Sequence, residues 1–546
     1  MTLTVRLLAA ALTIAAIAAP AAAHASPKQM SIMMDDDLLL YRSDSVTSRA
    51  LAQMKTMGVD TVRVTVLWRN VAERARPSLK EIRKLKGRAR SRAKRQRKRF
   101  EADDPRTYPR RNWDRYDNLV KAAAKAGLRV YFNVTGPGPS WAHRRPPRRL
   151  RRIRATYKPR AGAYKLFVKA VGRRFDGSYR DENGARDVLP RVSMWSLWNE
   201  PNQAGWLSPQ WEKRGSRWMP AAPAIFRRLV QLGYEGLVAT GHRADNDIVL
   251  LAETAPLGAG GRSERSAMYP KRFLRELMCV KRSGKPYTGR SARLRRCGDF
   301  RRKGALQATG YAHHPYTKNL PPARRHRGRD ALTMANISEL GTLLDELAGT
   351  TGNLPSGLPL YLTEFGFETD PPDRHSGISP EDQATFNTLG ERIAWGNPRV
   401  AAQSQFLLAD VAPLKRHKKG SKAYWSTYQS GLFGLDGRPK PAAYAYALPF
   451  IATRAGTDPA TGLPSFALWG QLRFLSNGVA DVAQIQWRPR GSSGPWTSVG
   501  APVAIDPLGY FTATRGAPSA APGEWRALWS RPGGGVGLAS RAATGD

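Results

Sequence analysis

Apolar positions recur at two alternating spacings along this chain, one typical of an amphipathic helix and one typical of a buried strand. A helical segment, a glycine and a strand-like run follow one another three times, over residues 45–68, 116–134 and 224–253. Glycine ends helices well because it adopts a left-handed backbone conformation without steric cost. Strands that alternate with helices in this way predict a parallel sheet.

Eight candidate strands predict a closed (β/α)8 TIM barrel of the α/β class. They lie at 30–33, 59–68, 128–134, 192–198, 248–253, 306–311, 358–363 and 402–408. An open doubly wound sheet is the alternative. Such a sheet usually holds a nucleotide at a glycine-rich first turn, and no G-x-G-x-x-G follows a strand in this sequence.

Long insertions separate some of these strands from the helices that follow them. They span about 70–110, 136–160, 255–305 and 365–380. Each one follows a strand rather than a helix, so we expect all four on the catalytic face of the barrel, where they would form a cleft or lid.

The pattern changes past Pro449, where short strand-like runs alternate with glycine, proline and serine turns. This spacing predicts a small C-terminal antiparallel β-sandwich over 460–546, after a barrel domain over 26–452. Its tryptophans would either bind carbohydrate or fill the core, and we favour a structural or linking role.

Residues 1–25 carry one arginine, an apolar run and the small-residue sequence Ala23-His24-Ala25. This arrangement is typical of a signal peptide, and a retained anchor is the alternative. We therefore expect a secreted or cell-surface protein with no transmembrane segment in the mature chain.

Two cysteines, Cys279 and Cys297, lie in one polar segment. In an exported protein an isolated pair of this kind favours a disulfide within an external loop over a metal site, which would need further ligands nearby.

The formal net charge of +45 is concentrated in the insertions. Fourteen lysines and arginines lie between Arg74 and Arg99, within a basic insertion over about 74–111, and a second basic run spans 144–160. The alternatives are a solvated insertion without a partner, contact with an acidic glycan or cell surface, and nucleic acid. Without any nucleic-acid-binding motif, we do not expect nucleic acid.

Two apolar strands each deliver a glutamate at their carboxyl end. Trp195-Ser-Leu-Trp-Asn-Glu200-Pro and Leu360-Tyr-Leu-Thr-Glu364-Phe-Gly resemble the corresponding strands of the retaining glycoside hydrolases of clan A, of the family 5 or family 39 type, over roughly residues 30–450. The resemblance implies a general acid/base at Glu200 and a nucleophile at Glu364. Carboxyls about 5–5.5 Å apart would cleave a glycosidic bond with retention.

Further site residues follow from the same resemblance. Arg63 matches the arginine beside the nucleophile, and Asn199 the group that binds the sugar 2-hydroxyl. His314 and Tyr316 match a His-x-Tyr motif, with Tyr316 donating to Glu364.

Indole rings beside strand ends can stack on sugars, and we expect this of Trp68 and Trp425. We expect no cofactor and no metal, because no further ligand stands at metal-binding spacing from His313 and His314.

The leading hypothesis is a secreted β-glycosidase that hydrolyses a polysaccharide or oligosaccharide. The alternative is a non-catalytic protein that binds an acidic or cell-surface glycan on a barrel scaffold, although a pure binder has no need of two close carboxylates.

Overall fold

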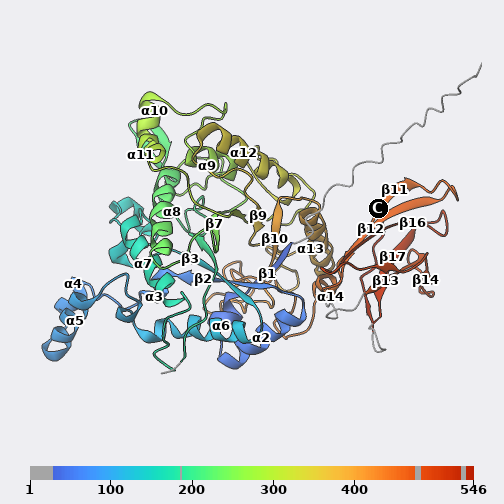
Figure 1. The fold of residues 1–546 in the computed structure, drawn as a ribbon, viewed down its shortest axis with the longest axis horizontal. Coiled ribbons are helices and arrows are strands. Elements are labelled where there is room, and N and C mark those ends of the chain that lie inside the picture. Colours follow the sequence, from blue (N-terminus) through green and yellow to red (C-terminus); the bar gives the residue numbers. More distant parts are fainter. Residues whose placement is uncertain (1–28, 185–186, 474–480, 531–536, 546) are drawn as a thin grey trace, which may run out of the picture.

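Eight parallel strands close into a barrel in the computed structural model, which describes residues 29–184, 187–473, 481–530 and 537–545. The barrel strands follow one another in chain order, and the last one, β10, pairs with the first, β1. Helices surround the barrel (Figure 1). The (β/α)8 barrel predicted from the sequence is confirmed.

The barrel strands lie at the predicted apolar runs, with shifts at their ends. Their bounds are β1 (Met30–Met34), β2 (Thr61–Leu67), β3 (Arg129–Thr135), β4 (Met194–Leu197), β7 (Ile248–Thr254), β8 (Gly310–His313), β9 (Leu360–Leu362) and β10 (Val400–Phe406). The sixth strand was predicted over 306–311 and runs instead from Gly310 to His313. The reason is that the Leu306 N–H donates to the Asn353 carbonyl, outside the sheet.

The three helix–glycine–strand units form as predicted. Helices α2 (Asp44–Thr56), α6 (Asp114–Lys125) and α8 (Ala222–Val238) are followed by Gly58, Gly127 and Gly241, whose φ angles are +73°, +65° and +80°. The other helices around the barrel are α1 (Asp36–Leu40), α7 (Ala161–Arg174), η5 (Met334–Asn336), α12 (Ser338–Thr351), α13 (Pro380–Trp395) and α14 (Pro441–Ala447).

The long insertions follow the strands, as predicted. After β2 come α3 (Trp68–Val71), α4 (Leu79–Lys84), α5 (Gly87–Arg99), η1 (Pro105–Thr107) and η2 (Arg110–Asn112), and after β3 come η3 (Ser140–Ala142) and η4 (Arg148–Ile153). After β7 come α9 (Pro270–Leu277), α10 (Gly289–Leu294) and α11 (Cys297–Arg302). The basic helices α4 and α5 project from the barrel at the left of Figure 1. Two further insertions were not predicted, a hairpin of β5 (Trp211–Arg214) and β6 (Arg217–Pro220) after β4, and the loop 407–440 after β10.

Cys279 and Cys297 form the predicted disulfide, with a Cα–Cα distance of 5.9 Å. The bond ties the residues after α9 to the start of α11, and both cysteines are buried. The disulfide therefore holds together the two ends of the polar segment 279–297, which lies within the insertion that follows β7.

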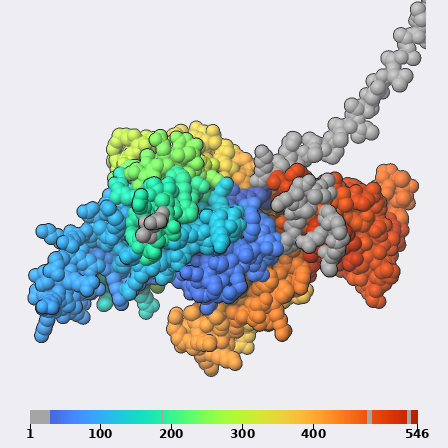
Figure 2. Space-filling model, turned by 60° about the horizontal axis from the view of Figure 1, so that its bottom comes forward, coloured from blue at the N-terminus to red at the C-terminus, as the bar shows by residue number. Residues whose placement is uncertain are grey.

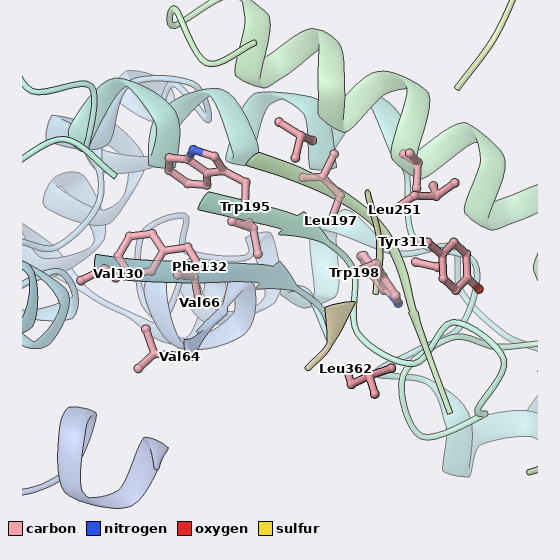
Figure 3. Close-up of a cluster of buried hydrophobic side chains, with 14 of the residues drawn as sticks. Val64, Val66, Val130, Phe132, Trp195, Leu197, Trp198, Leu251, Tyr311 and Leu362 are labelled. Atoms are coloured by element: carbon pink, nitrogen blue, oxygen red, sulfur yellow. The ribbon is translucent and has the colours of Figure 1, made fainter. Parts of the chain in front are cut away.

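The barrel strands are buried on both faces. Inside the barrel a layer of apolar side chains consists of Ile32, Tyr131, Met194, Leu250, Ala312, Tyr361 and Ala402. On the outer face, side chains such as Val64, Phe132 and Trp195 lie between the strands and the helices (Figure 3), and the rings of Phe132 and Trp195 pack edge to face at 5.7 Å. This double burial explains why the strands read as continuous apolar runs.

Past Pro449 two antiparallel sheets pack around a second core, which confirms the predicted β-sandwich. The first contains β11 (Phe450–Thr457), β12 (Pro464–Gln471) and β16 (Tyr510–Gly516), and the second contains β13 (Val482–Pro489), β14 (Thr497–Ser498), β15 (Val503–Ala504), β17 (Gly523–Trp529) and β18 (Leu538–Ala539). Trp487, Trp525 and Trp529 are buried in this core. They are therefore structural residues. The sandwich forms a lobe beside the barrel (Figure 2).

Arg473 joins the sandwich to the barrel. Its guanidinium pairs with Glu391 of α13 at 2.8 Å and donates to Ser31 Oγ of β1 at 3.2 Å. Trp395 of α13 packs on Trp469 with ring centroids 5.7 Å apart. The sandwich is therefore anchored on α13 and on the amino-terminal end of β1.

No helix within the described residues has the length and apolar character needed to cross a bilayer. The predicted signal peptide over 1–25 lies outside the described residues.

Candidate active site

Glu200 and Glu364, predicted as the catalytic pair, meet at the carboxyl-terminal rim of the barrel. Glu200 follows β4 and Glu364 follows β9. One carboxylate oxygen of Glu200 lies within 4.8 Å of one of Glu364. Their side chains are 21% and 12% exposed. Both carboxyl groups are thus close together and open to a bound molecule.

The backbone beneath the site adopts conformations that are rare for residues other than glycine. Trp198, Glu200, Ala252 and Glu253 have φ angles of +77°, +37°, +85° and +77°. The Glu200 N–H donates to the Glu253 carbonyl at 3.0 Å, which ties the ends of β4 and β7 together. Such left-handed conformations cost free energy and are concentrated at functional sites.

Three donors converge on Glu364. Arg63 Nη1 lies 3.0 Å from Oε1, the Tyr316 hydroxyl donates to Oε2 at 3.2 Å, and His314 Nδ1 lies 3.4 Å from Oε2. Burial raises the pKa of Glu364, and the charges of His314 and Arg63 oppose this increase. The predicted contact between Tyr316 and Glu364 is present.

His314 lies between three carboxylates. Its Nδ1 is 3.1 Å from Glu200 Oε1, and its Nε2 is 2.7 Å from Glu253 Oε2. Burial alone would lower the pKa of His314, but the charges of Glu364 and Glu253 and hydrogen bonds to Glu200 and Glu253 raise it to about 10. At neutral pH this imidazole therefore carries a proton on each nitrogen and a positive charge.

Glu253 is completely buried, unlike the carboxyl groups of Glu200 and Glu364. Arg63 Nη2 lies 2.9 Å from its Oε2, and the hydroxyls of Ser196 and Thr363 donate to it at 2.6 and 2.8 Å. Tyr131 also donates to this carboxylate. Burial acts to raise the pKa of Glu253, but Arg63 and His314 hold it well below its usual range. Glu253 is therefore a fixed anion beneath the catalytic pair.

Three buried charged groups lie beneath Glu200 and Glu364. Arg63 and His314 contribute two positive charges, and Glu253 contributes one negative charge. The net charge of these three buried groups is therefore positive, and the negative charge of Glu364 lies directly against it.

Glu200, His314 and Glu364 each offer one possible metal-ligand atom, all within 4.8 Å of one another. This grouping could not be predicted from spacing along the chain, because folding brings it together from three different strands. A histidine with a pKa of about 10 has no free lone pair near neutral pH. A metal ion bound here would have to displace a proton from His314.

Asn199 and His313 are both buried. Arg63 Nη2 donates to Asn199 Oδ1 at 2.9 Å, which fixes the orientation of that amide. His313 instead points away from the catalytic pair, with Nε2 3.0 Å from the Leu332 carbonyl and Nδ1 2.8 Å from Thr254 Oγ1. Burial lowers the pKa of His313 to about 3, so it is neutral and structural.

A cavity of about 660 Å³ reaches Tyr316, whose hydroxyl donates to Glu364, although neither Glu200 nor Glu364 lines it. Tyr316, Phe406, Tyr428 and Glu368 are among its lining residues. Tyr428 is 53% exposed, and burial of its hydroxyl together with the charges of Glu364 and Glu200 raises its pKa to about 12. Tyr428 lies in the unpredicted loop after β10 and is not among the residues predicted from the sequence. Its ring lies 5.2 Å from that of Phe406 at the strand end.

Trp68 does not lie in the cleft. It is completely buried and stacks on Phe167 at 5.3 Å, with Tyr164 also in contact. The prediction that Trp68 stacks on sugar is therefore wrong, because α3 begins at this residue and directs the indole into the core. Trp425 is half-buried in the loop after β10 and packs edge to face on Tyr424 at 5.0 Å.

No protein-family model matches the sequence, and no curated protein does. Among solved structures the chain is similar to a glucosidase from Croceicoccus marinus, with 15% identity, a TM-score of 0.41 and coverage of 83% of this chain and 76% of that chain. It is also similar to GH5_18 from Streptomyces cattleya in complex with GlcNAc, with 17% identity, a TM-score of 0.43 and coverage of 78% and 79%. A β-glycosidase from Thermosphaera aggregans matches at 14% identity and a TM-score of 0.41, with coverage of 77% and 95%. These likenesses concern the fold alone.

Proposed function

We propose that this chain is a retaining β-glycosidase that hydrolyses O-glycosidic bonds of an oligosaccharide or polysaccharide by double displacement. The observation that supports this most directly is the pair Glu200 and Glu364, with one oxygen of each within 4.8 Å of the other. Inverting enzymes hold their carboxyls about 6.5–9.5 Å apart to admit a water molecule, and retaining enzymes hold them about 5–5.5 Å apart.

Glu364 is the nucleophile in this proposal. Arg63 is directly paired with it, and Tyr316 donates to its other oxygen. These contacts favour an ionised Glu364, so Glu200 is the general acid in this proposal. In the first step a Glu364 oxygen bonds to the anomeric carbon, the bond to the leaving oxygen breaks, and Glu200 transfers its proton to that oxygen.

In the second step Glu200 acts as a base. It takes a proton from a water molecule whose oxygen bonds to the anomeric carbon, while the bond to Glu364 breaks. Throughout both steps His314 donates toward Glu200 and Glu253, and its positive charge offsets part of the negative charge of the site. Because Arg63 holds Asn199 Oδ1, the amide nitrogen is the end of Asn199 that would donate to the sugar 2-hydroxyl.

Secretion is part of the proposal. The disulfide between Cys279 and Cys297 supports it, since disulfides persist mainly in oxidising compartments. The basic insertions would face an acidic glycan or a cell surface in that setting.

The test is hydrolysis of a panel of aryl β-glycosides and β-linked polysaccharides by the wild type, Glu364→Gln and a matched control, Glu346→Gln, which changes an exposed glutamate on α12. We expect Glu364→Gln to lower kcat by at least about 10³-fold and Glu346→Gln to have no effect. Proton NMR of the first product should detect the β-anomer. Absence of turnover on the whole panel would favour a glycan-binding protein, and turnover that survives Glu364→Gln would remove the nucleophile assignment.

A further inference from the structure

A second cavity, of about 910 Å³, lies in the loops that follow β2 and β3. Eight of its lining residues are cationic, namely Arg69, Lys80 and six arginines between Arg144 and Arg154, and none is acidic. It is therefore a concave site with a strong positive charge, distinct from the cavity that reaches Tyr316.

These eight cations lack carboxylate partners within the described part of the chain. The neighbouring Arg149, which does not line the cavity, pairs with Glu264 at 2.5 Å. By contrast, no ion pair within the described ranges involves Arg148, Arg151 or Arg152. Unpaired guanidinium groups around one cavity are available to bind oxyanions with two parallel hydrogen bonds each.

A small cluster of buried side chains holds the loop that carries the arginines. Leu150, Ile153 and Tyr157 form a small buried cluster, while Arg148, Arg151 and Arg152 are exposed. Alternation of apolar and basic residues along η4 thus buries one side of the segment and presents the other to solvent. This organisation differs from that of α5, where Ala93 is the buried residue in an otherwise mainly exposed basic helix.

The same loop is bonded to the loop that carries Glu200. Ser208 N donates to the Thr156 carbonyl at 2.9 Å, and Lys158 N donates to the Ser208 carbonyl at 2.7 Å. Thr156 Oγ1 also donates to the Ala204 carbonyl at 3.1 Å. The loop that lines the basic cavity is therefore fastened to the loop that carries Glu200.

We infer that this arginine-lined cavity binds the anionic groups of an acidic glycan, so that the substrate is a polysaccharide bearing carboxylate or sulfate groups. This inference rests on the proposed glycosidase function for its identification of the ligand as a glycan. The cavity lining contains no tryptophan, tyrosine or phenylalanine on which nucleobases would stack, which argues against single-stranded nucleic acid. Duplex DNA is read by protein elements that project into its grooves, and a concave site does not project in this way.

The experiment measures binding of fluorescently labelled polygalacturonate, dextran sulfate and neutral dextran to the full chain carrying Glu364→Gln, so that turnover does not interfere. The cavity variant adds Arg148→Ala, Arg151→Ala and Arg152→Ala. The matched control adds Arg88→Ala, Arg92→Ala and Arg95→Ala, which removes the same charge from exposed positions of α5. Thermal unfolding checks that both variants fold.

We expect the cavity variant to lose at least tenfold in affinity for one or both anionic polymers, and the control to lose less than twofold. The polymer affected identifies carboxylate or sulfate as the preferred group. The inference would be overturned if both variants lost the same affinity for the anionic polymers, or if neutral dextran bound as tightly as these polymers do. It would also be overturned if a DNA duplex of equal charge bound more tightly than either anionic polymer. Because binding is measured without turnover, a failure of the proposed catalysis would appear separately, as inactivity of the wild type.

Discussion

His314 Nε2 lies 2.7 Å from Glu253 Oε2, where the neighbouring strands β7 and β8 end. The other nitrogen of the same ring lies 3.1 Å from Glu200. The imidazole thus connects a completely buried carboxylate with one that a substrate can reach. Through the His314 ring, the buried carboxylate of Glu253 is linked to the carboxyl group of Glu200.

Glu253→Gln should lower the free energy of unfolding and shift the alkaline limit of activity to lower pH. The change leaves Arg63 without one buried partner, and loss of a partner from a buried ion pair costs about 3–5 kcal/mol. It also removes one of the charges that raise the pKa of His314, so the alkaline limb of the kcat/KM profile should move to lower pH. Denaturant unfolding and pH–rate profiles measure the two effects.

A matched control is Glu276→Gln, since Glu276 is also buried and pairs with Arg295 at 2.6 Å. It should lower stability without moving the alkaline limb. If Glu253→Gln behaved in the same way, Glu253 would be a structural residue only.

Stability should depend on the protonation of His314. Its folded-state pKa of about 10 exceeds the ordinary value of 6.5, so the folded protein binds more protons between these two values. The stabilisation from His314 is therefore complete below pH 6.5 and is lost as the pH rises toward 10. The free energy of unfolding should fall over this interval in the wild type and fall less in His314→Gln, as urea titrations at several pH values would measure. Parallel curves for the two proteins would contradict this.

Glu200→Ala should affect substrates according to their leaving groups. Poor leaving groups need the proton that Glu200 supplies, and general acid catalysis contributes about 10²–10⁴-fold. Glycosides with strongly acidic phenols need little protonation, so their first step should change much less. Pre-steady-state rates across a series of aryl glycosides measure this dependence. A uniform loss across the series would argue against Glu200 as the acid.

Tyr428→Ala should weaken substrate binding. Its exposed ring lines the cavity that reaches Tyr316, and aromatic contacts of this kind contribute about 0.5–1.5 kcal/mol. We expect KM for an oligosaccharide to rise about threefold to tenfold. Tyr444→Ala is the control, because Tyr444 on α14 is 52% exposed, nearly as much as Tyr428 at 53%. Equal effects of the two substitutions would exclude a specific role for Tyr428.

The sequence predicted the barrel and the strand ends that carry Glu200 and Glu364 because both depend on local patterns, whereas Arg63, Asn199, His314 and Tyr316 followed from the family resemblance. Strand ends can be located from apolar runs, and Glu200 and Glu364 follow such runs directly. Trp68 was misplaced because a residue at a strand end can face either the cleft or the core, and periodicity does not distinguish the two.

The charge network under the site was harder to predict. Tyr131 and Ser196 are polar residues at inward positions of apolar strands, and this was an available signal that they share a buried partner. Their convergence on Glu253 depends on the register of β3, β4 and β7. Tyr428 gave no such signal, since loop conformation brings it to the cavity.

The backbone bonds between Thr156, Lys158 and Ser208 fasten the loop of the arginine-lined cavity to the loop that carries Glu200. On the inferred function, a polymer anchored by an anionic group in this cavity would therefore be cleaved at a constant distance from that group. The anionic group would then lie at a constant position relative to the new chain end.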